Sequence, residues 1–234
     1  MTVHNIEELI RRQFRQWELY REMRRDPDRD EPPLMRPVIT ISRELGAGAR
    51  ALAHDLAQRL DLQIHGISLI DQIARDKNLE RRFVDQLDES TCSRIDLWVQ
   101  GILNRRLFMH DEYHLALAKA VRMLSANGGV VIIGRGANVI LSDTAALRIR
   151  VTAGMPTRIA NVMRYEKVDA AAAKGLIADS DRNRRAFMQT AFEIDPDDPR
   201  QYDLSLNTDR FDPSLLVIVV MAALESGRCF PGEE

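Results

Sequence analysis

The sequence predicts an α/β fold, in which a central parallel sheet of five strands is flanked by helices on both faces. Two observations predict it. Short runs of apolar and β-branched residues alternate with longer stretches of helical periodicity, and glycines or small polar residues follow several of these runs. Parallel strands need such helical crossovers, because the chain must return to the same edge of the sheet before the next strand begins.

The first four residues of the clearest strand, "VVIIGRG", are all apolar and β-branched, which is typical of a strand buried on both faces. The predicted strands are residues 38–42, 62–66, 130–136, 147–153 and 202–208. The predicted helices follow the first strand from about residue 49 and then occupy much of 67–127, 156–192 and 213–226. Because residues 67–127 carry few strand signals, they are predicted to be a helical insertion.

The N-terminal segment is predicted to be an amphipathic helix over residues 4–25. Its apolar residues recur at near-helical spacing: Ile6, Leu9, Ile10, Phe14, Trp17, Tyr20 and Met23. Prolines and charges in 24–37 then interrupt regular structure. We therefore expect residues 1–36 to form a helix and linker that precede a main domain of residues 37–228. The helix could dock on this domain or pair with a second copy in a homodimer.

Composition narrows the classes of partner. The formal net charge is −2, so no overall basic field points to nucleic acid or to an acidic membrane surface. The longest apolar run, residues 215–224, is too short to span a bilayer and is predicted to be a buried helix. The N-terminus lacks the apolar core of an export signal, so we expect a cytoplasmic protein. Cys92 and Cys229 lie far apart and form no metal-ligand spacing.

The segment after the first strand, "SRELGAGAR", has the outline of a phosphate-binding loop without its usual lysine. Gly46 and Gly48 allow consecutive backbone N–H groups to point inward, and the helix that begins near Ala49 favours an anion at its N-terminus. Ala49 stands where the motif places lysine, so a positive side chain would come from Arg50 or Arg43. The alternative is a tight turn that binds nothing.

Ligands of open parallel sheets gather beyond the carboxyl ends of the strands. The other predicted strands end near Gly134–Gly136, 153–157 and 207–209, and arginines lie close to these positions. We therefore expect one site at this edge of the sheet.

Four segments in series resemble the cytidylate kinase-like family: "ISRELGAGAR", "VVIIGRGANVIL", "DRNRR" and "YDLSLNT". The resemblance covers about residues 37–226. It implies the three-layer fold of the P-loop NTPases and ATP-dependent phosphoryl transfer to a nucleoside monophosphate, by resemblance CMP or dCMP. It also implies Mg²⁺, although Arg50 or Ala51 occupies the position of the hydroxyl ligand, so the protein ligand is not identified.

The resemblance assigns roles by position, with residues 67–127 as the acceptor-binding region and about 156–200 as the lid. The donor phosphates would lie on Gly46, Ala47, Gly48, Ala49 and Arg50, with Arg158 near the adenine or a phosphate. Asp181 and Arg184 would close the lid and, with Arg50, act in catalysis. Arg135, Arg43 and Arg185 would bind the acceptor.

Three positions depart from the family pattern, namely Ala49, Gly136 and Ile177. They leave two other functions open: a nucleotide-binding or regulatory protein with little turnover, and a kinase of another small phosphorylated acceptor. Two simpler interpretations also remain. Arg135 could form a structural salt bridge, and residues 181–185 could be a solvated charged helix face.

Overall fold

The computed structural model describes residues 8, 11, 12, 14, 15, 17, 18, 36–104 and 112–226. A five-stranded sheet with the order β2-β3-β1-β4-β5 lies at its centre, and every adjacent pair of strands is parallel. The strands are β1 (Val38–Arg43), β2 (Gln63–His65), β3 (Val130–Ile133), β4 (Leu147–Thr152) and β5 (Leu204–Asn207). The predicted α/β fold with five parallel strands is confirmed.

The register aligns the ends of the three central strands. Ile41 of β1 pairs with Ile133 of β3 on one side and with Ile149 of β4 on the other. The segments that leave these strands therefore begin at one edge of the sheet, as the sequence predicted. The third strand ends at Ile133 rather than at residue 136, because residues 134–136 all have positive φ and turn away from the sheet.

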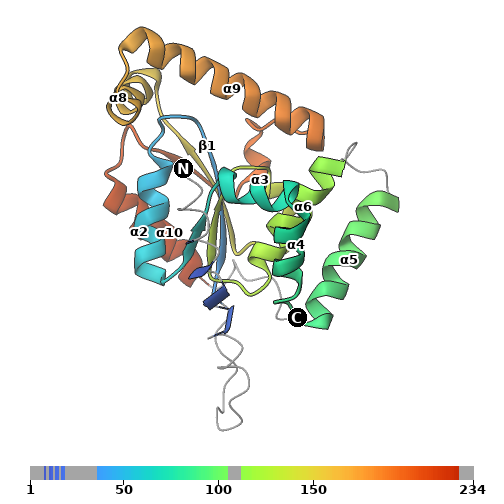
Figure 1. The fold of residues 1–234 in the computed structure, drawn as a ribbon. Coiled ribbons are helices and arrows are strands. Elements are labelled where there is room, and N and C mark those ends of the chain that lie inside the picture. Colours follow the sequence, from blue (N-terminus) through green and yellow to red (C-terminus); the bar gives the residue numbers. More distant parts are fainter. Residues whose placement is uncertain are drawn as a thin grey trace.

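Helices cover both faces of the sheet (Figure 1). The helices are α2 (Ala49–Leu60), α3 (Ile67–Arg75), α4 (Lys77–Val84), α5 (Glu89–Asn104), α6 (Glu112–Ser125), α7 (Ala137–Ile140), α8 (Met155–Glu166), α9 (Ala170–Phe192), the short η1 (Pro199–Gln201) and α10 (Pro213–Glu225). The predicted helical stretch 156–192 is two helices. Lys167 has a left-handed φ of 56° and ends α8, and the Asp169 side chain caps α9 by accepting from the Ala172 N–H.

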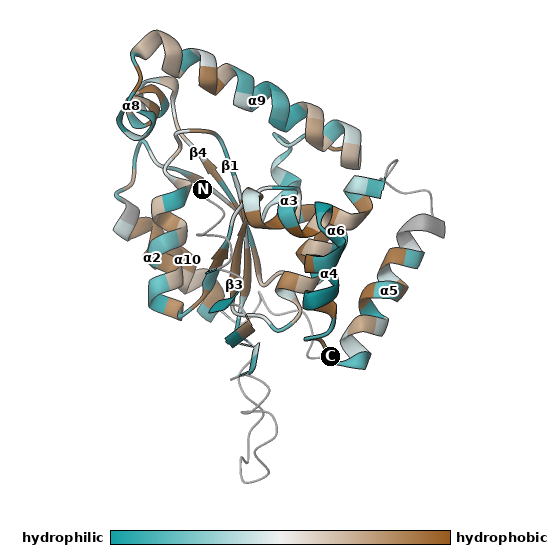
Figure 2. Cartoon of the chain, in the orientation of Figure 1, coloured by the Kyte–Doolittle hydropathy of each residue, from teal (hydrophilic) through white to brown (hydrophobic). Residues whose placement is uncertain are grey.

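Alternate residues of β1 and β3 belong to two separate hydrophobic cores, one on each face of the sheet. Ile39 and Ile41 of β1 pack with α2 and α10 on one face, where Leu56 and Val217 are fully buried. Strands β1 and β3 send Val38, Val130 and Ile132 to the other face, against α3, α4, α6 and the last turns of α9. Strand β3 and most of helix α10 are uniformly hydrophobic, whereas α9 carries much of its length in polar residues (Figure 2). This pattern leaves α9 free to cross the sheet edge as a polar lid.

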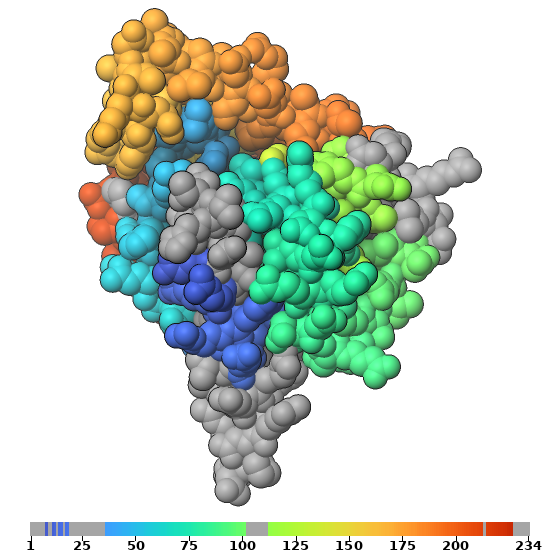
Figure 3. Space-filling model, viewed as in Figure 1, coloured from blue at the N-terminus to red at the C-terminus, as the bar shows by residue number. Residues whose placement is uncertain are grey.

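Helices α8 and α9 form one end of the molecule, beyond the carboxyl ends of the strands (Figures 1 and 3). In the space-filling view their gold and orange surface lies above the blue segment that follows β1. The lid predicted for residues 156–200 therefore lies next to the predicted phosphate loop.

The described residues of the N-terminal segment are helical, and two of its apolar residues pack on the same chain. The Trp17 side chain is only 2% exposed, and the rings of Phe14 and Trp17 lie 4.8 and 5.7 Å from the ring of Phe83 in α4. Gln63 of β2 also donates to the carbonyl of Arg12. The other residues of the predicted stripe lie outside the described part of the chain. A homodimer through this helix stays a prediction.

Helix α10 differs from the prediction of a buried helix. One face is buried through Leu216, Val217, Val220 and Leu224, whereas Leu215, Ile218 and Val219 are at least 40% exposed. The uniform apolar run conceals this difference, because only packing against α2 decides which residues are covered. Across the described residues, no helix is both long and apolar enough to cross a membrane.

His65, the last residue of β2, is fully buried, and neither ring nitrogen has a hydrogen-bond partner within the described ranges. Burial disfavours the charged imidazolium and lowers the pKa of His65 from 6.5 to about 4. Between these pH values the unfolded chain binds a proton that the folded chain does not. The free energy of unfolding therefore falls as the pH drops from 6.5 through about 4.

The fall in the free energy of unfolding amounts to roughly 3 kcal/mol for one proton over that pH range, and we expect His65→Leu to abolish it. Urea unfolding at pH 7 and at pH 4 measures it as the difference between the two unfolding free energies. His54→Leu is the matched control, since the His54 side chain is 72% exposed and its loss should leave that difference unchanged. A His65→Leu variant that keeps the wild-type difference would assign the acid sensitivity to other groups.

Candidate functional site

The loop after β1 passes close beneath α8. Gly46 has a φ of +83°, and a Cβ atom at this position would lie 2.5 Å from the carbonyl oxygen of Arg158 in α8. Both the left-handed backbone and the close approach of a neighbouring main chain require glycine. The loop is therefore shaped by contact with the lid as well as by its own sequence.

Side chains from outside the loop hold three successive loop carbonyls. Arg158 Nε donates to the carbonyl of Leu45 at 2.7 Å, Asn161 Nδ2 to that of Gly46 at 2.8 Å, and Thr208 Oγ1 to that of Ala47 at 3.1 Å. With the carbonyls turned toward α8 and β5, the backbone N–H groups are left for another acceptor.

The backbone N–H groups of five loop residues donate to no acceptor in residues 36–104 or 112–226, namely Leu45, Gly46, Gly48, Ala49 and Arg50. The last two open helix α2, whose N-terminal dipole favours an anion. This arrangement presents N–H donors and a helix N-terminus to an anion, as a phosphate-binding loop requires, and phosphate binding there stays a prediction.

A pocket of about 550 Å³ lies against this loop. Its wall is formed by residues 43–51 on one side and by Val162, Tyr165 and Glu166 of α8 on the other. The predicted donor-binding residues Gly46, Ala47, Gly48, Ala49 and Arg50 therefore share one pocket, and the Arg50 side chain is exposed there.

A second pocket of about 800 Å³ opens between the sheet edge and α9. Its lining residues come from the end of β1, the turn after β3, the start of α3 and the middle of α9: Ser42, Arg43, Ile67, Gly134, Arg135, Gly136, Asn138, Ser180, Asn183, Arg184, Phe187 and Met188. Its arginines and polar side chains suit an anionic ligand. Three arginines predicted to bind phosphates, Arg43, Arg135 and Arg184, thus come together from distant segments.

Arg43 lines both pockets. Within the described residues its guanidinium has no hydrogen bond or ion pair. Burial lowers the pKa of Arg43, and the nearby charges of Arg50 and Arg184 lower it further. Arginine stays protonated in proteins, so the three like charges form a cationic cluster where the two pockets meet. Of the three, only Arg184 pairs with a carboxylate among the described residues. An anion bound there would relieve the repulsion.

Arg184 is only partly engaged. Its Nη2 atom donates to Asp197 at 3.1 Å, whereas Nε and Nη1 are buried and without a partner in the part of the chain that the structure describes. Buried donors without acceptors are rare in native proteins. Two of the three guanidinium nitrogens of Arg184 are therefore available to an acceptor outside the described residues.

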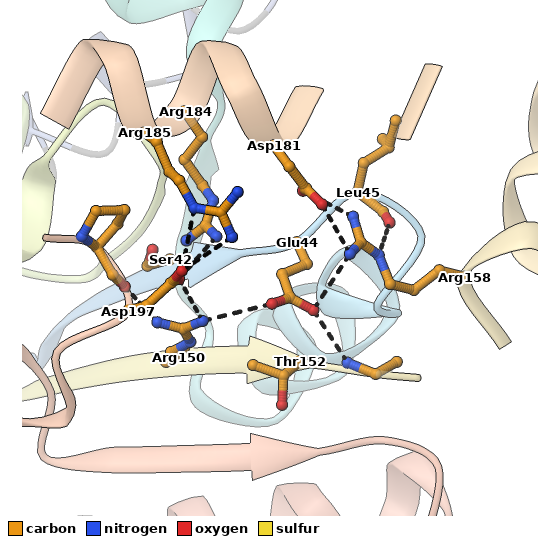
Figure 4. A network of polar contacts seen from close by, with 12 residues as sticks. Ser42, Glu44, Leu45, Arg150, Thr152, Arg158, Asp181, Arg184, Arg185 and Asp197 are labelled. Atoms are coloured by element: carbon orange, nitrogen blue, oxygen red, sulfur yellow. Dashed lines mark hydrogen bonds and ion pairs between the residues drawn. The ribbon is translucent and has the colours of Figure 1, made fainter. Parts of the chain in front are cut away.

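Arg158 and Asp181 form an ion pair with each other rather than facing a pocket. Two guanidinium nitrogens of Arg158 donate to the two carboxylate oxygens of Asp181 at 2.8 and 2.9 Å, and the Arg158 side chain is 5% exposed (Figure 4). The structure therefore pairs Arg158 with a carboxylate instead of showing its predicted contact with the adenine or a phosphate, and the lid role predicted for Asp181 stays a prediction. In this arrangement they join α8 to α9 and fix the loop carbonyl of Leu45.

Arg185 lies outside the acceptor pocket, which corrects its predicted contact with the acceptor. Its side chain is 59% exposed and donates to Asp197 through Nε and Nη2. Asp197 also accepts from Arg150 of β4 at 2.7 Å. Burial alone would raise the pKa of Asp197, but the hydrogen bonds from Arg150 and Arg185 lower it to about 2.

Arg135 forms the salt bridge that the sequence left as an alternative. Its guanidinium makes a two-point contact with Asp71 of α3, and the hydroxyl of Tyr113 donates to the same carboxylate at 3.0 Å. Asp71, Tyr113 and Asp197 were not identified from the sequence. Asp71 lies 64 residues from Arg135 and 42 residues from Tyr113, and Asp197 lies 47 residues from Arg150. No local motif marks these residues.

Gly136 departs from the family pattern for a reason that the structure supplies. Its φ is +66°, and a Cβ atom there would lie 2.2 Å from the ring of Phe192, which is itself 2% exposed in the core. An aspartate does not fit at this position. Asp71 supplies the carboxylate beside Arg135 instead.

The predicted Mg²⁺ finds no evident protein ligand. Among the described residues, no group of three or more His, Cys, Asp and Glu side chains could hold a metal ion. Of the acidic residues close to the loop, Glu44 and Asp181 are both engaged by arginines, and Glu166 lines the loop pocket.

Comparison with known proteins agrees with this geometry. Residues 38–210 match the sequence model of the Cytidylate kinase-like family. A cytidylate kinase from Halobacterium salinarum is 25% identical over 190 residues, which cover 81% of this chain and 90% of that protein. A cytidylate kinase from Pyrococcus horikoshii is 24% identical, over 80% of this chain and 88% of its own. An uncharacterized protein from Eubacterium ventriosum has a crystal structure of the same fold, with a TM-score of 0.64, 23% identity, and coverage of 82% and 99% of the two chains.

Proposed function

Because the chain belongs to the cytidylate kinase-like family, we propose that it transfers the γ-phosphoryl group of ATP to a nucleoside monophosphate. The observation that carries this proposal is the cluster of Arg43, Arg50 and Arg184 where two pockets meet, in which only Arg184 pairs with a carboxylate among the described residues. A phosphoryl group in transfer carries charge on several oxygens, and its stabilisation is mostly electrostatic. A site with three such cations between a donor loop and an acceptor pocket suits that chemistry.

The donor phosphates lie on the loop N–H groups of residues 46–50, with Arg50 beside them. The acceptor lies in the larger pocket, its monophosphate directed toward Arg43 and Arg184. An oxygen of this monophosphate forms the new P–O bond as the bond to the leaving oxygen of ADP breaks. The negative charge that remains on ADP faces the N-terminus of α2. The acceptor oxygen needs no base, because a phosphate monoester is largely ionised at neutral pH.

Mg²⁺ accompanies ATP in this family's reaction and supplies charge neutralisation when bound. We assign it to no residue of this chain, because no ligand set is evident among the described side chains.

CMP and dCMP are the proposed acceptors, by analogy with the cytidylate kinases to which the chain is similar. The contact between Arg135 and Asp71 and the exclusion of a side chain at Gly136 indicate that base recognition differs in detail from the family pattern. For that reason the identity of the acceptor is tested with a panel of nucleoside monophosphates.

The test combines purified protein, ATP, Mg²⁺ and a panel of nucleoside monophosphates with a readout of ADP formation and of thermal shift. We expect turnover with CMP or dCMP, and we expect Arg50→Met to lower it by about tenfold or more, because one cation near the phosphates is removed. Arg59→Met is a matched control on the exposed last turn of α2. Thermal shift by ATP without turnover on any acceptor would instead identify a nucleotide-binding protein.

A further inference from the structure

Asp197, in the segment between α9 and β5, gathers three arginines on one carboxylate. Arg150 of β4 donates to it at 2.7 Å, and Arg184 and Arg185 of α9 donate at 3.1 Å each (Figure 4). A carboxylate that accepts from several guanidinium groups holds each of them in a narrow range of positions. Asp197 therefore connects the sheet with the lid helix.

Among these three arginines, only Arg184 lines the acceptor pocket. One of its nitrogens is fixed on Asp197, and the other two have no partner within the described ranges. Asp197 thus anchors one end of the guanidinium and leaves the remaining donors for a ligand.

The contacts continue from Asp197 to the phosphate loop. Arg150 Nη2 also lies 3.4 Å from Glu44 Oε1, and Glu44 Oε2 lies 3.6 Å from Arg158 Nη1. Arg158 in turn holds the carbonyl of Leu45. Figure 4 shows this uninterrupted series of polar contacts from α9 to the loop. It relates the position of Arg184 to that of the donor phosphates.

We propose that Asp197 is a positioning residue for phosphate binding, acting by holding Arg184 at a set place relative to the loop. The inference rests on the proposed function for the identity of the substrates, but not for the presence of the anion site. If Asp197 were only a negative charge near that site, its removal would strengthen anion binding, because the site would become more positive. Positioning predicts the opposite sign.

The first test measures binding of inorganic pyrophosphate by titration calorimetry. We expect Asp197→Asn, which keeps the shape and removes the charge, to weaken binding about tenfold, the effect of disordering one charge-assisted contact. Equal or tighter binding would overturn the proposal. Asp198→Asn is the matched control, since Asp198 pairs with Arg200, whose side chain is 87% exposed, and it should leave binding unchanged.

A second test asks whether Asp197 acts through Arg184. We expect Arg184→Met to weaken pyrophosphate binding at least as much as Asp197→Asn, and we expect the double variant to be no weaker than Arg184→Met alone. Additive losses in the double variant would overturn the positioning role. If Asp197→Asn instead disrupts folding, the double variant will unfold at a lower temperature than Arg184→Met. Thermal unfolding of both variants therefore separates a folding defect from lost positioning.

The transfer reaction supplies a third readout. Because Arg184 lines the acceptor pocket and not the loop pocket, Asp197→Asn should lower kcat/KM for the acceptor about tenfold and change KM for ATP less than twofold. A loss confined to KM for ATP would contradict this assignment. If the wild-type protein transfers to no acceptor, the proposed function fails and the pyrophosphate comparison still decides the role of Asp197. A wild-type protein that binds no pyrophosphate overturns both.

Discussion

Replacing Arg43 with methionine is expected to lower kcat for phosphoryl transfer by about 100-fold to 1,000-fold while leaving the fold at least as stable as the wild type. Arg43 lines both pockets, so its guanidinium is placed to contact the phosphoryl group between donor and acceptor. It pairs with no carboxylate in the described residues, and Arg50 and Arg184 repel it. Its removal therefore takes away a cation that stabilises the transition state, and it also removes a like-charge repulsion from the free enzyme.

Steady-state kinetics and thermal unfolding measure the two effects together. Arg43→Lys keeps the charge and loses the planar fork, so we expect intermediate activity from it. Arg43→Met with a rate within threefold of the wild type would remove Arg43 from the reaction. A marked fall in thermal stability would show that Arg43 stabilises the fold. Arg50 lines only the loop pocket, whereas Arg43 lines both pockets. The variant with the larger loss of kcat, Arg43→Met or Arg50→Met, identifies the arginine that replaces the absent lysine.

The second large effect is expected at Gly136, where Gly136→Asp would recreate the family's Gly-Arg-Asp segment and yet destabilise the protein by about 3 kcal/mol or more. Two causes add. The residue has a left-handed φ of +66°, and the new Cβ atom would lie 2.2 Å from the Phe192 ring. Phe192 is 2% exposed and contacts Phe187 ring to ring, so it has little room to move. Restoring the consensus residue should therefore harm both stability and activity.

Urea unfolding measures the loss, and a double-variant cycle isolates its cause. In a Phe192→Ala background the ring is absent, so Gly136→Asp should cost less there than in the wild type. Gly175→Ala is the matched control: Gly175 lies within α9, and a Cβ atom there would meet nothing within 4 Å. We expect that change to be neutral or stabilising by up to about 1 kcal/mol. If Gly136→Asp is as stable as the wild type, the Phe192 ring can move away from the new Cβ atom at little cost in stability.

The strand periodicity determined the fold class, and the loop and strand ends determined which edge of the sheet carries the site. This follows because parallel strands place all their carboxyl ends together, so residues such as Arg43 and Arg135 must meet there whatever the details of packing. The conformation of the loop could also be predicted from its glycines, because an anion-binding loop depends on backbone geometry that the local sequence encodes.

Only the tertiary structure decided which arginines face a ligand and which are bound by carboxylates. Arg158 pairs with Asp181 across 23 residues, Arg150 with Asp197 across 47, and Arg135 with Asp71 across 64. No spacing rule reaches over such separations, because an ion pair depends on where helices pack and not on local periodicity. The chain itself determined that its cations gather at one edge of the sheet. Among the described residues, the packing of α3, α8 and α9 determined that Arg43 is left without a carboxylate and that Arg184 is held by one of its nitrogens.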